Sequence, residues 1–342
     1  MSSKFFDTQE STGDDIKNRI SHSQLKKYRT CPHKWQLHYR DKLRPPEESI
    51  YFIFGSSMHE VLQEYLQKMY SGTAKKANEM DLKGRFNKLL KQEYDRRKEE
   101  FEKEYPDKEF PVKKKEMVQF YRDGEQIIGY FKRNRSEYFP KQTMELVGIE
   151  EKVEKGLRPG IAFVGYLDIV LRDKVSGKYK IIDLKTSTDG WDKWKKREKK
   201  RTDQLVAYKS FYADKLGIDP SQIEIEYLIM RRELNSNASY KPSRFQRFQP
   251  SDGSQSRSRV EDKINEFIDN CFTSDGEYKE KEFEKKPGKY KCAFCNYSFQ
   301  HGKKGYQICD QGGKTFMDYG PNMAPYVDDK FVGPQPEQNK AS

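Results

Sequence analysis

The sequence predicts an α/β protein in which helices flank a central mixed sheet. Two runs rich in branched apolar residues, 163–171 and 181–186, have the composition of buried strands. A helix-like segment, 202–216, follows them and leads to another strand-like run, 224–230. A helix between two strands is typical of a parallel crossover. We therefore expect a sheet that mixes a hairpin with a parallel pair, and an edge strand at 245–248.

The composition limits the classes of function. The 342 residues suggest two domains, or one domain with a large insertion. The 22 tyrosines and 21 phenylalanines can supply a core although 35% of the residues are charged. The net charge of +12 favours a polyanionic partner, either nucleic acid or an anionic membrane surface. No apolar run reaches the length of a membrane span, and residues 1–15 lack the pattern of a signal peptide, so we expect an intracellular protein.

Shifts in composition divide the chain into six segments. These are a disordered tail (1–19), N-terminal helices (20–72), a helical insertion of mixed charge (73–140), the sheet-containing core (141–275), a cysteine-rich region (276–319) and a flexible Pro-rich tail (320–342). The insertion either covers one side of a site in the core or forms a solvated helical hairpin without a ligand.

Four helices are expected outside the sheet region, at 23–39, 57–70, 118–138 and 260–272. In the second of these, His59 falls at the edge of the apolar stripe while Glu60 points roughly opposite. His59 can therefore face an internal site, although a histidine at such an edge is more often a packing residue.

Two charged residues interrupt the strand at 181–186, and one interrupts the strand before it. Asp183 and Lys185 project from one face because side chains alternate along a strand. A hairpin turning at 173–177 would bring Asp168 beside Asp183. Two neighbouring carboxylates repel each other unless a cation lies between them, and hard oxygen ligands suit Mg²⁺ or Mn²⁺. Taken alone, a pair such as Asp183 and Lys185 is more often a structural ion pair than a catalytic one.

The order of these motifs resembles the PD-(D/E)XK nuclease superfamily and, within it, the RecB-like exonuclease branch. A helix with Gln204 and Tyr208 on one face follows the two charged strands. The matching pieces span residues 54–208 and are F-G-S-S-M-H-E with His59, G-Y-L-D ending at Asp168, I-I-D-L-K-T-S around Asp183 and Lys185, and Q-L-V-A-Y from Gln204 to Tyr208.

This resemblance implies a three-layer, restriction-endonuclease-like α/β/α core and divalent-metal-dependent hydrolysis of DNA. It implies His59, Asp168 and Asp183 as metal ligands, and Lys185 as a catalytic residue supported by Gln204 and Tyr208. Such enzymes are mostly exonucleases of DNA recombination, repair or end processing in a bacterial or phage-infected cell. The substrate would be DNA with a single-stranded end, supplied with the help of a helicase or recombination partner. A structure-specific endonuclease with the same site, and a non-catalytic nucleic-acid-binding subunit, are the alternatives.

Four of the five cysteines form a pattern of metal-binding thiolates. Cys292 and Cys295 make a C-x-x-C, Cys309 follows, and Cys31 lies far away in the sequence. They can bind zinc or a 4Fe-4S cluster, or remain plain thiols. The layout resembles the iron-staple nucleases, a group that includes AddB and CRISPR-associated exonucleases, although there the last cysteine follows the C-x-x-C more closely. Cys271 lies on a helical apolar pattern and is expected in the core.

A basic, aromatic segment follows the charged strand. Basic side chains offset phosphate charge, and exposed aromatic rings stack on the bases of single strands. Its position beside the expected site favours contact with the substrate strand over a merely solvated face. The residues predicted to bind nucleic acid are Trp191, Trp194, Lys195, Lys196 and Arg197.

Overall fold

The computed structural model describes residues 16–44, 48–234, 242–288, 291–292, 294–298 and 309. The chain divides into two compact units. The first comprises residues 1–26 and 47–281, and the second comprises 27–46 and 282–342. The predicted tail at 320–342, and most of the one at 1–19, lie outside the described residues. Within the part of the chain that is described, no helix is both long and apolar enough to cross a membrane.

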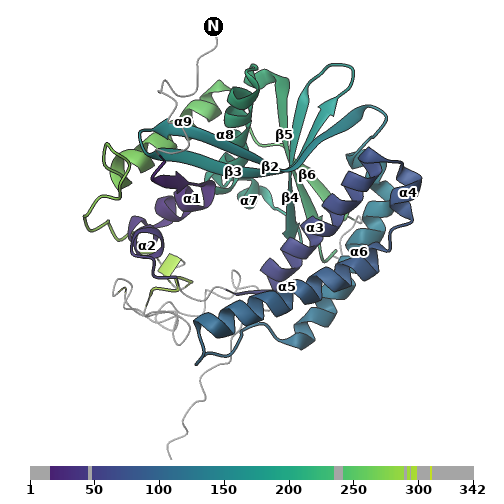
Figure 1. Cartoon of the computed structure of the whole chain (residues 1–342), viewed down its shortest axis with the longest axis horizontal. Helices are drawn as coiled ribbons and strands as arrows, with labels where there is room; N and C mark the ends of the chain where they lie inside the picture. The colour runs from purple at the N-terminus through teal and green to yellow at the C-terminus, as the bar shows by residue number, and fades with distance from the viewer. Residues whose placement is uncertain are drawn as a thin grey trace, which may run out of the picture. The chain divides into compact units, whose positions relative to one another are not determined.

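A six-stranded mixed sheet is the centre of the first unit (Figure 1). Its order is β1-β3-β4-β5-β6, and β2 pairs with β3. The strands are β1 (Asn18–Ile20), β2 (Met144–Arg158), β3 (Ile161–Asp173), β4 (Tyr179–Ser187), β5 (Ile223–Arg231) and β6 (Phe245–Phe248). The prediction of a disordered tail through residue 19 was wrong at its end, because β1 pairs in parallel with β3.

The expected hairpin joins β3 and β4. Its turn is fixed by Asp173, whose Oδ1 accepts hydrogen bonds from the backbone N–H groups of Val175 and Ser176. The register pairs Ile169 with Ile182, so Asp168 and Asp183 each lie one residue beyond this pair. β4 then runs parallel to β5, and β6 adds an antiparallel edge strand, as the sequence predicts.

Helices cover both faces of this sheet. On one face, a single apolar core joins Ile182 and Leu184 of β4 to the helices of residues 50–138. The helices of charged composition therefore form a layer of the fold, which excludes a solvated hairpin. The helices of this layer are α3 (Ile50–Ser71), α4 (Ala74–Asn78), α5 (Leu82–Glu104) and α6 (Lys114–Tyr138).

The other layer consists of α8 (Lys199–Leu216) and α9 (Ser254–Cys271). Phe211 of α8 packs on Phe163 of β3 with ring centroids 4.6 Å apart. Cys271 is fully buried at the end of α9, in the core position that its pattern predicts. The first unit thus has the three layers expected of a restriction-endonuclease-like fold.

The segment expected to be one helix from 23 to 39 forms three shorter helices. α1 (His22–Thr30) ends before Cys31, and a short α2 (Pro32–Trp35) continues as the π-helix η2 (Gln36–Arg40). The break has a local cause: Pro32 lacks an N–H group, and it holds Cys31 in an extended conformation. The boundary between the two units falls within α1.

Candidate active site

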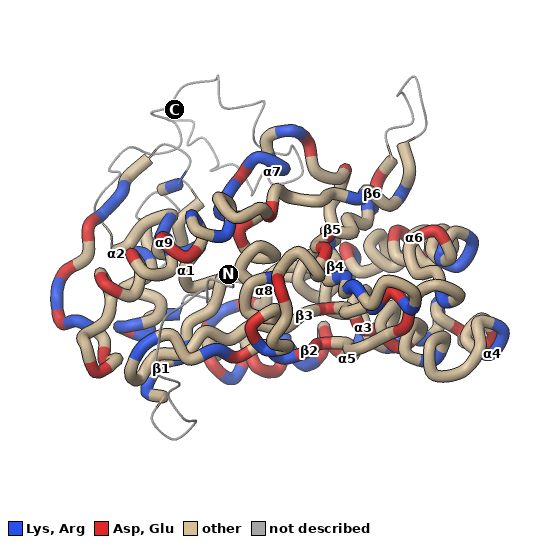
Figure 2. The backbone as a smooth tube through the Cα atoms, turned by 90° about the horizontal axis from the view of Figure 1, so that it is seen from above, with Lys and Arg blue, Asp and Glu red and all other residues tan. Residues whose placement is uncertain are grey.

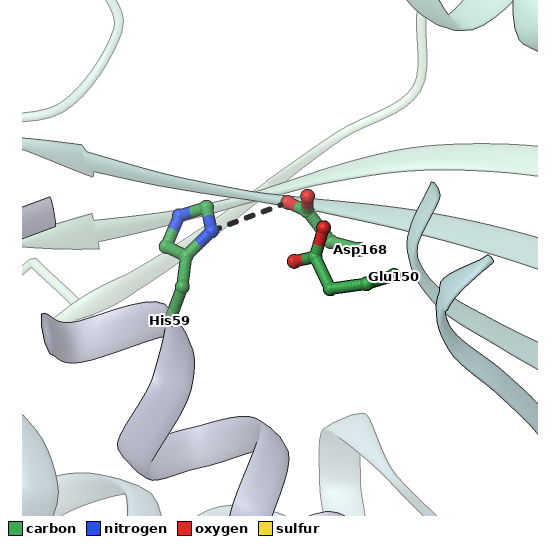
Figure 3. A group of neighbouring side chains, drawn as sticks. All are labelled: His59, Glu150 and Asp168. Atoms are coloured by element: carbon green, nitrogen blue, oxygen red, sulfur yellow. Dashed lines mark ion pairs between the residues drawn. The ribbon is translucent and has the colours of Figure 1, made fainter. Parts of the chain in front are cut away.

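Three side chains from different elements meet at one point beside the sheet. His59 comes from α3, Glu150 from β2 and Asp168 from β3 (Figure 3). Each offers a ligand atom, and these atoms all lie within 4.8 Å of one another. The Nδ1 atom of His59 is 3.6 Å from Oδ2 of Asp168. An imidazole and two carboxylates at this spacing form a donor set for a hard divalent cation.

Asp183 and Lys185 lie next to this group on β4. The backbone N–H of Leu184 donates to Oδ2 of Asp168 over 2.7 Å, which ties the two strands together at the site. Lys185 Nζ is 2.6 Å from Oδ2 of Asp183. Asp183 is 3% exposed, whereas the Lys185 side chain is 32% exposed. The amine is therefore the member of the pair that a substrate can reach.

Burial governs the protonation of the site. It raises the pKa of both Asp168 and Asp183 to about 6, against the opposing effect of the Lys185 charge. Burial, together with the Lys185 charge, lowers the pKa of His59 to about 4. Burial would also lower the pKa of Lys185, but the charges of Asp183 and Asp168 outweigh it and the pKa is raised. Near neutral pH the histidine is thus an uncharged ligand and the lysine a cation.

Gln204 and Tyr208 complete the site from α8. Nε2 of Gln204 donates to the Tyr208 hydroxyl over 3.2 Å. Tyr208 is 6% exposed and packs directly on the backbone of β3 at Gly165. A Cβ atom at Gly165 would lie 2.4 Å from the tyrosine ring. The glycine of the G-Y-L-D motif therefore makes room for the tyrosine of the Q-L-V-A-Y motif.

The sequence model of a known family matches the part of the chain that builds this site. The match covers residues 19–300 and the family is the PD-(D/E)XK nuclease superfamily. The chain belongs to this superfamily. Membership implies a nuclease that cleaves nucleic-acid phosphodiester bonds with a divalent metal.

Comparisons with individual proteins add little to this assignment. The solved structure titled "Crystal structure of SSO0001" is similar at 17% sequence identity, over 63% of this chain and 80% of that chain. Its TM-score is 0.28, too low to support any argument about function. The search of curated proteins found no match.

The nuclease fold brings together most of the site residues predicted from the sequence. His59 and Asp168 meet as expected, and Asp183 with Lys185 lies beside them. The third member of the group is Glu150, which the sequence analysis did not single out. Glu150 lies in β2 between the residues that pair with Ile169 and Leu167, so it is placed opposite Asp168. Only the register of the β2–β3 pair could have revealed it.

The basic segment of the nuclease follows β4 and begins at a buried tryptophan. Lysines and arginines line α7 (Lys193–Arg197), shown in blue in Figure 2. Trp191 is 5% exposed. Its backbone N–H donates to Oε1 of Gln246 over 2.7 Å, and its backbone carbonyl accepts from Nε2 of Gln246 over 3.0 Å. Trp194 is 65% exposed. Of the two rings expected to stack on bases, Trp191 is buried as an anchor and Trp194 faces solvent.

The predicted thiolates of the nuclease lie in the second unit. Cys31, Cys292, Cys295 and Cys309 line one cavity of about 40 Å³, and all four are free thiols. The backbone N–H of Lys286 donates to the sulfur of Cys31, and that of Gly288 to the sulfur of Cys292, both over 3.4 Å. Hydrogen bonds of this kind stabilise thiolates that ligate metals. In the described part of the chain, the one set of three or more such ligand atoms within 4.8 Å of one another is that of His59, Glu150 and Asp168, and no three of these sulfurs are so close.

Proposed function

We propose that the protein is a divalent-metal-dependent DNA exonuclease of the RecB-like branch, acting in DNA recombination, repair or end processing. The observation that carries this proposal is the convergence of His59, Glu150 and Asp168 beside the Asp183–Lys185 pair. An amine next to a set of hard ligands is the arrangement that phosphodiester hydrolysis requires. Two buried carboxyl groups with raised pKa values support a functional site.

The donor set fits Mg²⁺ or Mn²⁺. His59 would offer a neutral nitrogen, and Glu150 and Asp168 would offer carboxylate oxygens. Asp183 lies outside this group of three but interacts electrostatically with Asp168 and His59, and it would be a further ligand. A cation would also offset the repulsion between carboxylates that burial makes unfavourable. When bound, it supplies Lewis acidity toward the phosphodiester and lowers the pKa of water.

The remaining residues of the site would orient the reactants. Lys185 keeps its proton near neutral pH, so it can donate to a phosphoryl oxygen, stabilise the charge that builds there, and orient the attacking water. Tyr208 lies within the field of Asp183, Asp168 and Lys185, and Gln204 holds its hydroxyl. These two residues would fix the lysine or the scissile strand in place.

DNA is the proposed substrate, presented with a single-stranded end. The net charge of +12 favours a polyanion, and the exposed Trp194 lies among Lys195, Lys196 and Arg197 on α7. An exposed indole beside cations suits a single strand, whose bases are free to stack. A helicase or recombination partner would supply such an end inside the cell.

The four cysteines would form a structural metal site, with a 4Fe-4S cluster ahead of zinc. The shared cavity and the two N–H···S hydrogen bonds support thiolate ligation of either metal. The visible absorption spectrum of the anaerobically purified protein distinguishes them, because an iron–sulfur cluster absorbs visible light and zinc does not.

The test is cleavage of labelled DNA with Mg²⁺ or Mn²⁺, comparing linear and circular, single- and double-stranded substrates. We expect linear DNA to be degraded, circular single-stranded DNA to stay intact, and Asp183→Ala and Lys185→Ala to be inactive. The matched controls are Asp262→Ala and Lys178→Ala, which remove exposed charges on α9 and in the β3–β4 turn.

Three results would contradict the proposal. Cleavage of circular DNA would indicate an endonuclease. Binding without hydrolysis would indicate a non-catalytic subunit. Undiminished activity of the Asp183 and Lys185 variants would refute the site itself.

A further inference from the structure

We infer that Gln63 is a positioning residue of the metal site, which holds the Glu150 carboxylate in place and acts only through it. Gln63 lies on α3, one turn after His59, so one rigid helix carries both residues. Its side chain is buried, with 8% of the residue exposed. The inference rests on the proposed function, since it assigns a role in binding the cation proposed there.

Two hydrogen bonds place the Gln63 amide between the two acidic strands. Nε2 donates to Oε1 of Glu150 over 2.6 Å and to the backbone carbonyl of Asp168 over 3.2 Å. The carbonyl belongs to the rigid strand β3, so it fixes the direction of the amide. The second hydrogen of the same amide then holds the glutamate from β2. Gln63 thus links the two carboxylate-bearing residues without occupying the Asp168 carboxylate.

Glu150 needs this support because its backbone conformation is strained and its side chain loses entropy when it is ordered. Its φ of 50° lies in the left-handed region, which is strained for a residue other than glycine. Glu150 is exposed, so ordering its side chain costs rotamer entropy. A bond from a buried donor favours one rotamer and so reduces the disorder that a cation would otherwise have to overcome.

The chemistry of the amide suits a metal site better than that of a charged donor. A lysine or arginine in this place would neutralise Glu150 and compete with the cation. The Gln63 amide carries no net charge, so it orients the carboxylate while leaving its negative charge for a ligand. It also leaves Oε2 of Glu150 without a bond from this residue.

The test is calorimetric binding of Mn²⁺ to the full chain without DNA, counting only the binding that Asp168→Ala abolishes. Gln63→Leu keeps the approximate size of the side chain and removes the donor. We expect it to weaken Mn²⁺ binding about 10- to 100-fold, the usual effect of losing a residue that supports a ligand. Gln67→Leu, an exposed change one turn further along α3, is the matched control and should leave the affinity unchanged.

A double-mutant cycle shows whether Gln63 acts through Glu150. Gln63→Leu should have no further effect in a Glu150→Ala background. Wild-type affinity in Gln63→Leu, or an equal loss in both backgrounds, overturns the inference. If Gln63→Leu fails to fold, Gln63→Met, a good helix former of similar length, takes its place. Absence of Mn²⁺ binding by the wild type would instead reject the metal site of the proposed function, which is a separate outcome.

Discussion

Gly165→Ala should damage the site by displacing Tyr208. The added methyl would lie 2.4 Å from Cε1 and 2.9 Å from Cζ of the ring. An ordinary contact needs about 3.4 Å or more, so the ring must retreat by roughly 1 Å. Tyr208 is 6% exposed and packs edge-on to Phe163 at 6.3 Å, so it has little space to do so.

The expected magnitude follows from two opposing terms. Overpacking a core of this kind costs about 1–3 kcal/mol. Replacing a strand glycine by alanine regains about 0.5–1 kcal/mol of backbone entropy. A net loss of about 1–2 kcal/mol lowers the Tm by roughly 2–8 °C for a unit of this size. The hydroxyl would also move away from Gln204, and a shift of about 1 Å can cost on the order of 10²-fold in rate.

Thermal unfolding and metal-dependent DNA cleavage measure the two effects. Gly129→Ala on α6 is the control, because its Cβ would meet only the flexible end of Arg133 at 3.5 Å. It should raise stability by about 1 kcal/mol, as alanine does in a helix. In a Tyr208→Ala background, Gly165→Ala should become neutral or stabilising. An equal loss of stability in both backgrounds would refute the proposed clash.

Three further predictions follow from the site and the cysteine cavity. Because burial raises the pKa of Asp168 and Asp183 to about 6, protons compete with the cation below that pH. The Mn²⁺ affinity measured by calorimetry should be constant from about pH 7 to 8 and fall below about pH 6. The fall should be shallower in Asp183→Asn, and an affinity unchanged at pH 5 would contradict this. In metal-free protein, Glu150→Gly should be about 1 kcal/mol more stable to urea than Glu150→Ala, since glycine accepts the left-handed backbone; the reverse order would exclude strain there. Cys292→Ser with Cys295→Ser should remove bound iron or zinc, measured by elemental analysis, without changing Mn²⁺ affinity; retained metal would argue against these ligands.

Much of the sheet could be predicted from the sequence because burial imposes a short-range pattern. Branched runs mark β3, β4 and β5, and the Asp173–Gly177 segment has the residues of a tight turn. The hairpin then determines that β3 and β4 pair. The proximity of Asp168 to β4 follows from this local information, and the structure confirms it through the bond from Leu184.

Helix ends were predicted less well, since packing decides them. α3 begins at Ile50, earlier than the expected residue 57, although Gly55 is a weak helix former. Ile53 and Phe54 are fully buried in the shared core, which compensates for the glycine. In the opposite case, the apolar pattern through residue 39 suggested one helix, and the covalent geometry of Pro32 overrode it.

Glu150 was missed because its position depends on backbone features that a sequence pattern does not encode. A register shift between Leu146 and Gly148 interrupts the β2–β3 pairing just before it. Its left-handed φ then breaks the alternation of the strand. Glycine or asparagine would fit this conformation at less cost. The residue there is a glutamate whose carboxylate lies near the His59 ring and the Asp168 carboxylate. The chemistry of the side chain, rather than the conformation of the backbone, therefore explains its presence.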